Sequence, residues 1–126
     1  MATATVADLH DLERKVVKAM GIRGARYIHV HVPCPLGWGA ASHDTIRLAR
    51  LAVESGLFPI FEAQDGAVTG SRKIRRQVPV EEYLKPQKRF AHLFVSGQGR
   101  QQIAKLQAIA SRNIVEFHLL EQNGDA

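Results

Sequence analysis

Bulky residues alternate between two sides of the chain over residues 27–32, with isoleucine and valine on one side and tyrosine and histidine on the other. This period of two predicts a β-strand, and the bulk on both sides suggests that the strand lies inside its sheet. Pro33 and Pro35 flank Cys34 directly after it and bias the preceding residues towards an extended backbone. We therefore expect a stiff, cysteine-bearing segment at the carboxyl end of the strand, where open α/β sheets bind their ligands.

The residues before this strand predict a second strand and a helix. Residues 2–5 resemble the end of a strand, and Thr5 is expected to cap the helix that follows, with Asp8 three residues later. A helix followed by a strand is the rhythm of a parallel α/β sheet. The helix would bury an apolar stripe that consists of Leu9, Leu12, Val16, Ala19 and Met20.

Another helix is predicted after the cysteine segment. Ser42 is expected to cap it, and Ile46, Ala49 and Val53 lie on one face at helical spacing. Gly56 is expected to end this helix in the C′ position, where glycine is favoured because the backbone turns left-handed.

Residues 57–63 and 67–69 predict a β-hairpin rather than a further strand–helix–strand unit. Asp65 and Gly66 stand between the two runs and form a strong turn signal. Pro59 removes one ladder donor from the first run, which predicts a strand at the edge of the sheet.

The remainder of the chain is predicted to be helical. Pro79 stands at the first turn of a short helix that Pro86 halts. Asn123 and Gly124 are expected to end a long closing helix of about five turns. Its helically spaced apolar residues are Ile103, Leu106, Ala110, Ile114, Phe117 and Leu120.

Composition bounds the size of the protein and its cellular setting. The 126 residues, 45% of them hydrophobic, suffice for a single domain over residues 1–126. We expect residues 1–56 to end an α/β sheet and residues 57–126 to form the hairpin and a helical tail. One cysteine cannot form an intramolecular disulfide. No signal-peptide pattern and no apolar run of the roughly 18 residues that a membrane span needs are present, so we expect a cytoplasmic protein without a membrane partner.

Positive charge exceeds negative charge, with 17 Lys and Arg against 12 Asp and Glu. The excess is spread thinly except at Arg72, Lys73, Arg75 and Arg76. Few aromatic residues stand nearby to stack on bases, so we expect no nucleic-acid binding. A solvated face or a subunit rim is the expected role of this basic connection.

Cys34 allows three interpretations from the residues alone. It is a small buried hydrophobe, a nucleophile with His29, His31 or His43 as its base, or a ligand of a metal or an iron–sulfur cluster. The backbone amides of residues 36–39 could donate hydrogen bonds to cluster sulfurs. One cysteine cannot hold a cluster alone, because such clusters usually take four thiolates.

A zinc site is a further alternative for the same segment. His29 and His31 lie on one face of the predicted strand and could bind zinc together with Cys34. Their spacing is not that of a structural zinc site, and no fourth ligand is evident. Polar cover of the strand or contact with a partner is the expected role of these histidines.

Several blocks of sequence carry a resemblance to a known family. The run Pro33-Cys-Pro-Leu-Gly-Trp38, the helical segment 6–16 before it, and the segments 46–62 and 78–93 after it span almost the whole chain. In this order they resemble the carboxyl-terminal part of the beta subunit of 2-oxoacid:ferredoxin oxidoreductases, with the pyruvate enzyme (pyruvate synthase) as the nearest member. The resemblance implies part of a parallel sheet of the type that binds thiamine diphosphate, followed by a hairpin and helices.

The family resemblance also implies an activity and a set of cofactors. Members of the family oxidatively decarboxylate a 2-oxo acid to an acyl-coenzyme A, using thiamine diphosphate with Mg²⁺. Electrons pass through a [4Fe–4S] cluster to ferredoxin. The resemblance places the fourth cysteine ligand of that cluster at Cys34.

The family's other three cluster cysteines and its motif for thiamine diphosphate and magnesium do not occur in this sequence. We therefore assign no catalytic residue and no thiamine-binding residue here, and expect the isolated chain to be inactive. The implied partners are the remainder of the beta subunit and the alpha, gamma and delta-type subunits or domains, with ferredoxin and coenzyme A reached through the complex. Pyruvate, branched-chain 2-oxo acids and aryl glyoxylates remain open as substrates. A freestanding binding or assembly module is the competing hypothesis.

Overall fold

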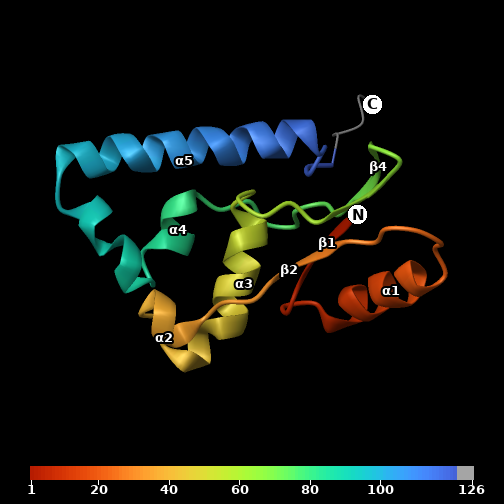
Figure 1. Cartoon of the computed structure of the whole chain (residues 1–126). Coiled ribbons are helices and arrows are strands. Elements are labelled where there is room, and N and C mark those ends of the chain that lie inside the picture. Colours follow the sequence, from red (N-terminus) through yellow and green to blue (C-terminus); the bar gives the residue numbers. More distant parts are fainter. Residues whose placement is uncertain (122–126) are drawn as a thin grey trace.

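The computed structural model describes residues 1–121, which form an open α/β structure (Figure 1). The fold class predicted from the sequence is confirmed. Within the described residues, no helix has both the length and the apolar character needed to cross a membrane. The elements in chain order are β1 (Ala2–Thr5), α1 (Leu9–Met20), β2 (Ile28–His31), α2 (Pro35–Trp38), the 3₁₀ turn η1 (Ser42–Asp44), α3 (Thr45–Glu54), β3 (Phe61–Gln64), β4 (Ala67–Ser71), α4 (Val80–Leu84), the 3₁₀ segment η2 (Lys88–Phe94) and α5 (Gly97–Glu116).

The strands form one mixed sheet with the order β2-β1-β3-β4. β1 and β2 are parallel, with Ala2 opposite Ile28 and Thr5 opposite His31. β2 is therefore an edge strand in the described chain, and the interior position predicted for it is wrong. Bulky residues on both faces indicate that other parts of the protein pack above and below the strand. They do not indicate how many strands are hydrogen-bonded to it. On one face His29 meets the Phe58 ring edge-on, with centroids 5.2 Å apart.

The hairpin forms as predicted, with β3 and β4 antiparallel and the turn at Asp65 and Gly66 between them. Its predicted edge position is wrong for the first strand, because β3 lies between β1 and β4. Pro59 precedes β3 and lies outside its hydrogen-bond ladder. The missing N–H of Pro59 therefore removes no hydrogen bond from the sheet. Its carbonyl instead accepts a 2.7 Å hydrogen bond from the Thr3 hydroxyl.

Helix α1 differs from its prediction at its start and on its buried face. Its N-cap is Asp8, whose carboxylate accepts a 3.0 Å hydrogen bond from the Asp11 amide, whereas Thr5 is the last residue of β1. Much of the predicted apolar stripe faces outward: Leu9 is 65% exposed and Met20 74%. The side chain buried against β1 is that of Lys15, 4% exposed, because its ammonium group finds polar partners there.

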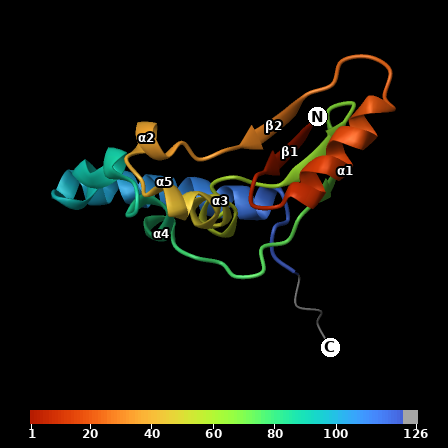
Figure 2. The same ribbon diagram turned by 90° about the horizontal axis from the view of Figure 1, so that it is seen from below.

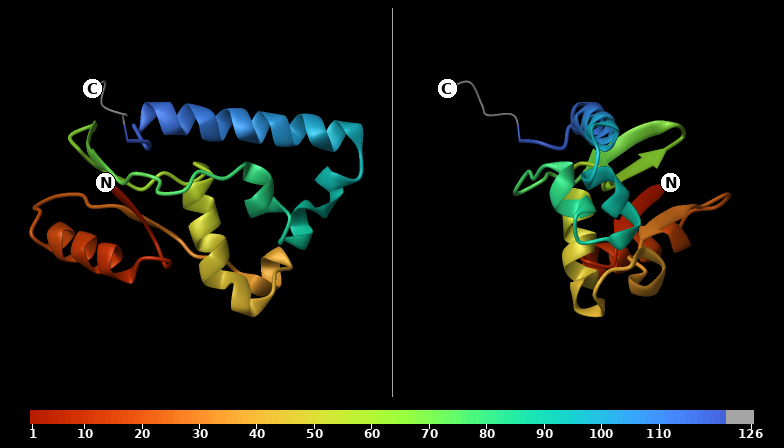
Figure 3. Two further views of the ribbon diagram at one scale, coloured as in Figure 1. Left: turned by 180° about the vertical axis from the view of Figure 1, so that it is seen from behind. Right: turned by 90° about the vertical axis from the view of Figure 1, so that its left-hand side faces the viewer.

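The main apolar core lies between α3, α4, η2 and α5, away from α1. Figure 1 shows α5 running along one side of the molecule with α3 and α4 beneath it, and Figure 2, seen from below, shows α5 behind α3. Figure 3 shows α1 on the opposite side of the strands. The buried apolar residues of this core are Leu48, Leu51, Ala52, Val78, Val80, Tyr83, Leu84, Leu93, Ile103 and Ala110.

The two ends of α3 differ in how well the sequence predicted them. Gly56 follows the helix with φ of 80°, as its C′ position predicted. Its carbonyl accepts a 2.9 Å hydrogen bond from the Asn113 side chain, which ties the end of α3 to α5. The predicted capping role of Ser42 is wrong: Ser42 begins the 3₁₀ turn η1, and its side chain caps no amide of α3.

Helix α5 ends earlier than its apolar spacing predicted. The last helical residue is Glu116, and His118 has a positive φ of 50°. The Leu119 amide donates back to the Ile114 carbonyl at 2.9 Å, which buries Leu119 to 1% exposure. Phe117 leaves the helix to stack on Phe61 of β3, with ring centroids 4.5 Å apart. The predicted stop at residues 123 and 124 lies outside the described residues.

Candidate functional site at the Cys34 turn

Residues 34–39, which we call the Cys34 turn, are separated from the carboxyl end of β2 by two residues. Cys34 precedes the single-turn helix α2 with an extended backbone, φ −110° and ψ 101°, as the proline after it predicts. Gly39 closes the turn in the left-handed conformation, with φ of 63°. Cys34 is exposed and carries a free thiol, which contradicts the interpretation of a small buried hydrophobe.

The backbone of the turn curls around the cysteine sulfur. A Cβ atom built at Gly37 would lie 3.3 Å from Cys34 Sγ, tighter than ordinary van der Waals contact. Glycine therefore allows the chain to approach the sulfur closely. An exposed sulfur cradled by backbone suits a soft metal ligand, because nearby peptide groups tune a bound metal–sulfur group.

The aromatic ring of Trp38 connects the turn to the start of η2. The guanidinium carbon of Arg89 lies 3.8 Å from the centroid of the Trp38 ring. The Lys88 amide donates to the Gly39 carbonyl at 3.2 Å, and the Lys88 side chain covers Gly39 so closely that a Cβ there would lie 2.7 Å from Lys88 Cβ. The Trp38 ring thus has a cationic contact that the sequence did not predict.

His31 lies beneath the turn in an aromatic setting. Its ring centroid is 5.0 Å from that of Phe58 and 5.8 Å from that of Trp38. Nε2 lies 3.4 Å from the Tyr83 hydroxyl, while Nδ1 is buried without a hydrogen-bond partner. Burial lowers the pKa of His31 to about 4, helped by the positive charge of Arg89 and by His29. His31 is therefore neutral at physiological pH.

The structure does not support the zinc hypothesis for this segment. Among residues 1–121 no group of three or more His, Cys, Asp or Glu side chains is placed to hold a metal ion. His29 and His31 point into the aromatic cluster with Phe58, which takes the place of a ligand set. In the same part of the chain no hydrogen bond joins Cys34 to a histidine, so a nucleophile–base pair is also unsupported.

The basic connection over residues 72–76 is occupied by contacts within the chain. Arg72 pairs with Asp8, and Lys73 donates to the His118 carbonyl at 2.5 Å. Arg76 lies 3.4 Å from the Glu82 carboxylate. These contacts fix the connection between β4 and α4 and agree with its interpretation as a solvated face.

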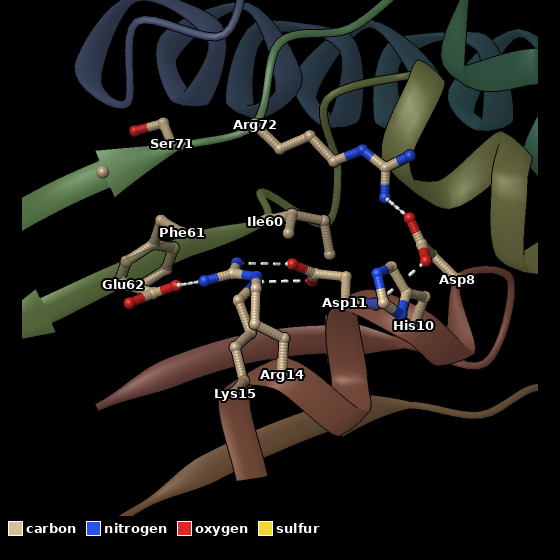
Figure 4. A pocket seen from close by; sticks show the side chains of 11 residues that line it. Asp8, His10, Asp11, Arg14, Lys15, Ile60, Phe61, Glu62, Ser71 and Arg72 are labelled. Carbon is tan, nitrogen blue, oxygen red and sulfur yellow. Dashed lines mark hydrogen bonds and ion pairs between the residues drawn. The ribbon is translucent and has the colours of Figure 1, made fainter. Parts of the chain in front are cut away.

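A hollow between α1 and the β3–β4 hairpin was not predicted from the sequence. Figure 4 shows Arg14 between the carboxylates of Asp11 and Glu62, at 2.7 and 2.9 Å. Its hydrogen bonds to these carboxylates raise the pKa of Arg14. The hydrogen bond from Lys18 is the main cause that lowers the pKa of Glu62. The charged side chains that line this hollow pair with one another. These ion pairs connect α1 to β3.

Comparison with known proteins gives the family context. No protein-family profile matches the chain. Over 119 residues it is 47% identical to pyruvate synthase subunit PorB of Methanosarcina barkeri, which covers 94% of this chain and 40% of that protein. This chain is a relative of the pyruvate synthase subunits. It is also 45% identical over 93 residues to subunit PorB of Methanocaldococcus jannaschii, covering 74% of this chain and 31% of that protein.

The resemblance to 2-oxoacid oxidoreductase subunits is thereby confirmed. Ketoisovalerate oxidoreductase subunit VorB of Pyrococcus abyssi is 42% identical over 94 residues, covering 73% of this chain and 30% of that protein. The chain thus spans 40% or less of the length of these pyruvate synthase and ketoisovalerate oxidoreductase relatives. The relatives' names differ in the 2-oxo acid. The similarity therefore indicates a class of oxidoreductase subunit and not one substrate.

Proposed function

We propose that this chain is part of the beta subunit of a 2-oxoacid:ferredoxin oxidoreductase, with pyruvate as the 2-oxo acid. Similarity to pyruvate synthase subunits along nearly the whole chain supports the enzyme class. The higher identity to the pyruvate synthase subunit than to the ketoisovalerate subunit, 47% against 42%, supports pyruvate. The assembled enzyme would also carry thiamine diphosphate with Mg²⁺ and use coenzyme A, bound by residues outside this chain.

Within that enzyme, Cys34 would supply one thiolate to a [4Fe–4S] cluster. The single observation that carries this assignment is the exposed sulfur at the end of β2, against which Gly37 brings the backbone close. A bound cluster would provide one-electron transfer between the substrate-derived carbanion and ferredoxin. The chain's own contribution is to hold the sulfur on a proline-stiffened turn that also carries Trp38.

Three further thiolates are needed, and this chain has no other cysteine. They would come from the remainder of the beta subunit, so the cluster site would form only in the assembled enzyme with its other subunits. We assign no catalytic residue within residues 1–126. The competing function, a freestanding binding or assembly module, requires instead that the chain folds alone and binds neither iron nor oxidoreductase subunits.

The test is Cys34→Ser in the assembled enzyme, purified through a tag on another subunit. Serine preserves the size of the side chain but is a poor ligand for this cluster, so the reduced cluster's electron paramagnetic resonance signal and iron content should fall while the subunits still assemble. Gly97→Ala is the matched control, because a Cβ there meets nothing within 4 Å. Undiminished cluster signal and electron transfer to ferredoxin in Cys34→Ser would refute the assignment. Absence of the chain from the complex would favour the freestanding module.

A further inference from the structure

The guanidinium group of Arg89 contacts two aromatic rings and has polar partners at two of its nitrogens. The group stacks on Trp38 at 3.8 Å and also lies 4.6 Å from the centroid of the Phe90 ring. Nε donates a 2.8 Å hydrogen bond to the side-chain oxygen of Gln87, and a terminal nitrogen lies 3.5 Å from the Tyr83 hydroxyl. Arginine suits such a site because its planar cation stacks on aromatic rings and donates in its own plane at the same time.

The support for Arg89 is itself rigid. Gln87 is 1% exposed, and its amide nitrogen donates to the Tyr83 carbonyl at 2.5 Å. The Gln87 side-chain oxygen is thereby aimed at Arg89. Tyr83 in turn is a buried residue of the main core. Arg89 is an exposed residue, and these contacts tie its guanidinium to buried residues of the core.

The stack also connects Arg89 to the cysteine. The Trp38 amide donates to the Cys34 carbonyl at 2.9 Å, so the ring that Arg89 covers belongs to the same helical turn as the sulfur. The Lys88 amide bond to Gly39 holds the other end of the turn. Residues 88 and 89 thus fix the Cys34 turn from the η2 side.

The positive charge of Arg89 is not neutralised by a carboxylate in the described structure. None of its contacts among residues 1–121 is an ion pair. The sequence from residue 83 to 115 contains no Asp or Glu. Arg89 is also one of the causes, after burial, that lower the pKa of His31, three residues before Cys34. Its field therefore reaches the end of β2.

We propose that Arg89 is a positioning residue that raises the reduction potential of a cluster bound through Cys34, by holding an unneutralised positive charge on the Trp38 face of the turn. A nearby positive charge favours the reduced cluster, because reduction adds one negative charge. Arg89 is exposed, and the rings of Trp38 and Phe90 shield its guanidinium from water where they contact it. This inference rests on the proposed function, since it requires that Cys34 binds the cluster.

The test is a redox titration of the assembled enzyme, followed by electron paramagnetic resonance, in three variants. Arg89→Met should shift the midpoint potential of the cluster to a more negative value. Arg89→Lys should stay near the unsubstituted enzyme, because it keeps the charge and can still lie over the Trp38 ring. Arg112→Met, which removes one exposed charge near the end of α5, should leave the potential unchanged. A purely structural role would instead make the Lys and Met variants equally altered.

The outcomes separate this inference from the function on which it rests. If Cys34→Ser keeps a full cluster signal, the proposed function fails. If Cys34→Ser loses the cluster while Arg89→Met leaves the potential unchanged, only the role of Arg89 fails. If Arg89→Met loses iron, the titration uses Arg89→Gln, whose planar amide can still stack without a charge. A negative shift in that variant supports the proposal, and an unchanged potential overturns it.

Discussion

The ammonium group of Lys15 lies 2.6 Å from the Asp11 carboxylate, on the buried face of α1. The same nitrogen donates a 2.8 Å hydrogen bond to the Thr3 carbonyl of β1. A charge that is 4% exposed needs such partners, because moving it out of water is costly. Helix and strand are thus held together by a polar contact where an apolar one would be expected.

Asp11→Ala should destabilise the protein by about 3 kcal/mol, because it leaves Lys15 buried without its counter-ion. Arg14→Ala is the control on the same helix: Arg14 also pairs with Asp11, but its side chain is 54% exposed. Its removal should cost less than about 1 kcal/mol. Urea unfolding followed by circular dichroism measures both. Equal losses of unfolding free energy in the two variants would show that the buried Lys15–Asp11 pair contributes no more to stability than the exposed Arg14–Asp11 pair.

Gly56→Ala should destabilise the packing of α3 on α5 by about 2–4 kcal/mol. Gly56 has φ of 80°, and a Cβ there would lie 2.8 Å from Ile114 Cγ1. Gly66→Ala separates the two causes, since Gly66 has a similar φ of 83° but open space around it. That variant should lose only about 1 kcal/mol from backbone strain. Thermal unfolding of both variants checks the difference, and a smaller loss for Gly56→Ala would contradict the close contact.

The lowered pKa of His31 should make stability fall at acidic pH. The unfolded chain binds a proton near pH 6.5, whereas the folded chain binds it only at about pH 4. The stabilising contribution is therefore complete above pH 6.5 and is lost as the pH falls from 6.5 to 4. In the folded chain the titratable groups near His31 are Arg89, His29 and Tyr83. None of them supplies a negative charge that would stabilise the protonated imidazole.

The measurement compares unfolding free energies at pH 7 and pH 5 in the unsubstituted chain and in His31→Phe, which fills the aromatic cluster without titrating. The unsubstituted chain should lose more stability between the two pH values. His92→Gln, at an exposed position of η2, is the control and should behave like the unsubstituted chain. Identical pH dependence in His31→Phe and the unsubstituted chain would disprove the burial of a neutral His31.

Local signals in the sequence predicted several elements well. The turn at Asp65 and Gly66 and the end of α3 at Gly56 depend on backbone conformations that few residues adopt, so these residues identify them directly. The stiff segment around Cys34 follows from its two prolines in the same way. The parallel pairing of β1 with β2 follows from the helix between them.

The features that were missed depend on contacts between distant segments. Apolar spacing extended the closing helix past Glu116, but the helix ends there and the Phe117 ring stacks on Phe61, which lies far away in sequence. The burial of Lys15 was not predicted, because no local pattern shows that Thr3 and Asp11 will satisfy its charge. Arg89 and Trp38 are far apart in the sequence, and only the folded chain brings the guanidinium onto the ring.

The central position of β1 bears on the order in which the chain can fold during synthesis. β1 pairs with residues 28–31 on one side and with β3, at Glu62, on the other. The β1–α1–β2 unit needs only contacts that are short in sequence, so it can form before residues 61–71 have been synthesised. The second edge of β1 must then wait for the hairpin. During that interval a nascent chain carries an open strand edge that a chaperone or a partner subunit would have to protect.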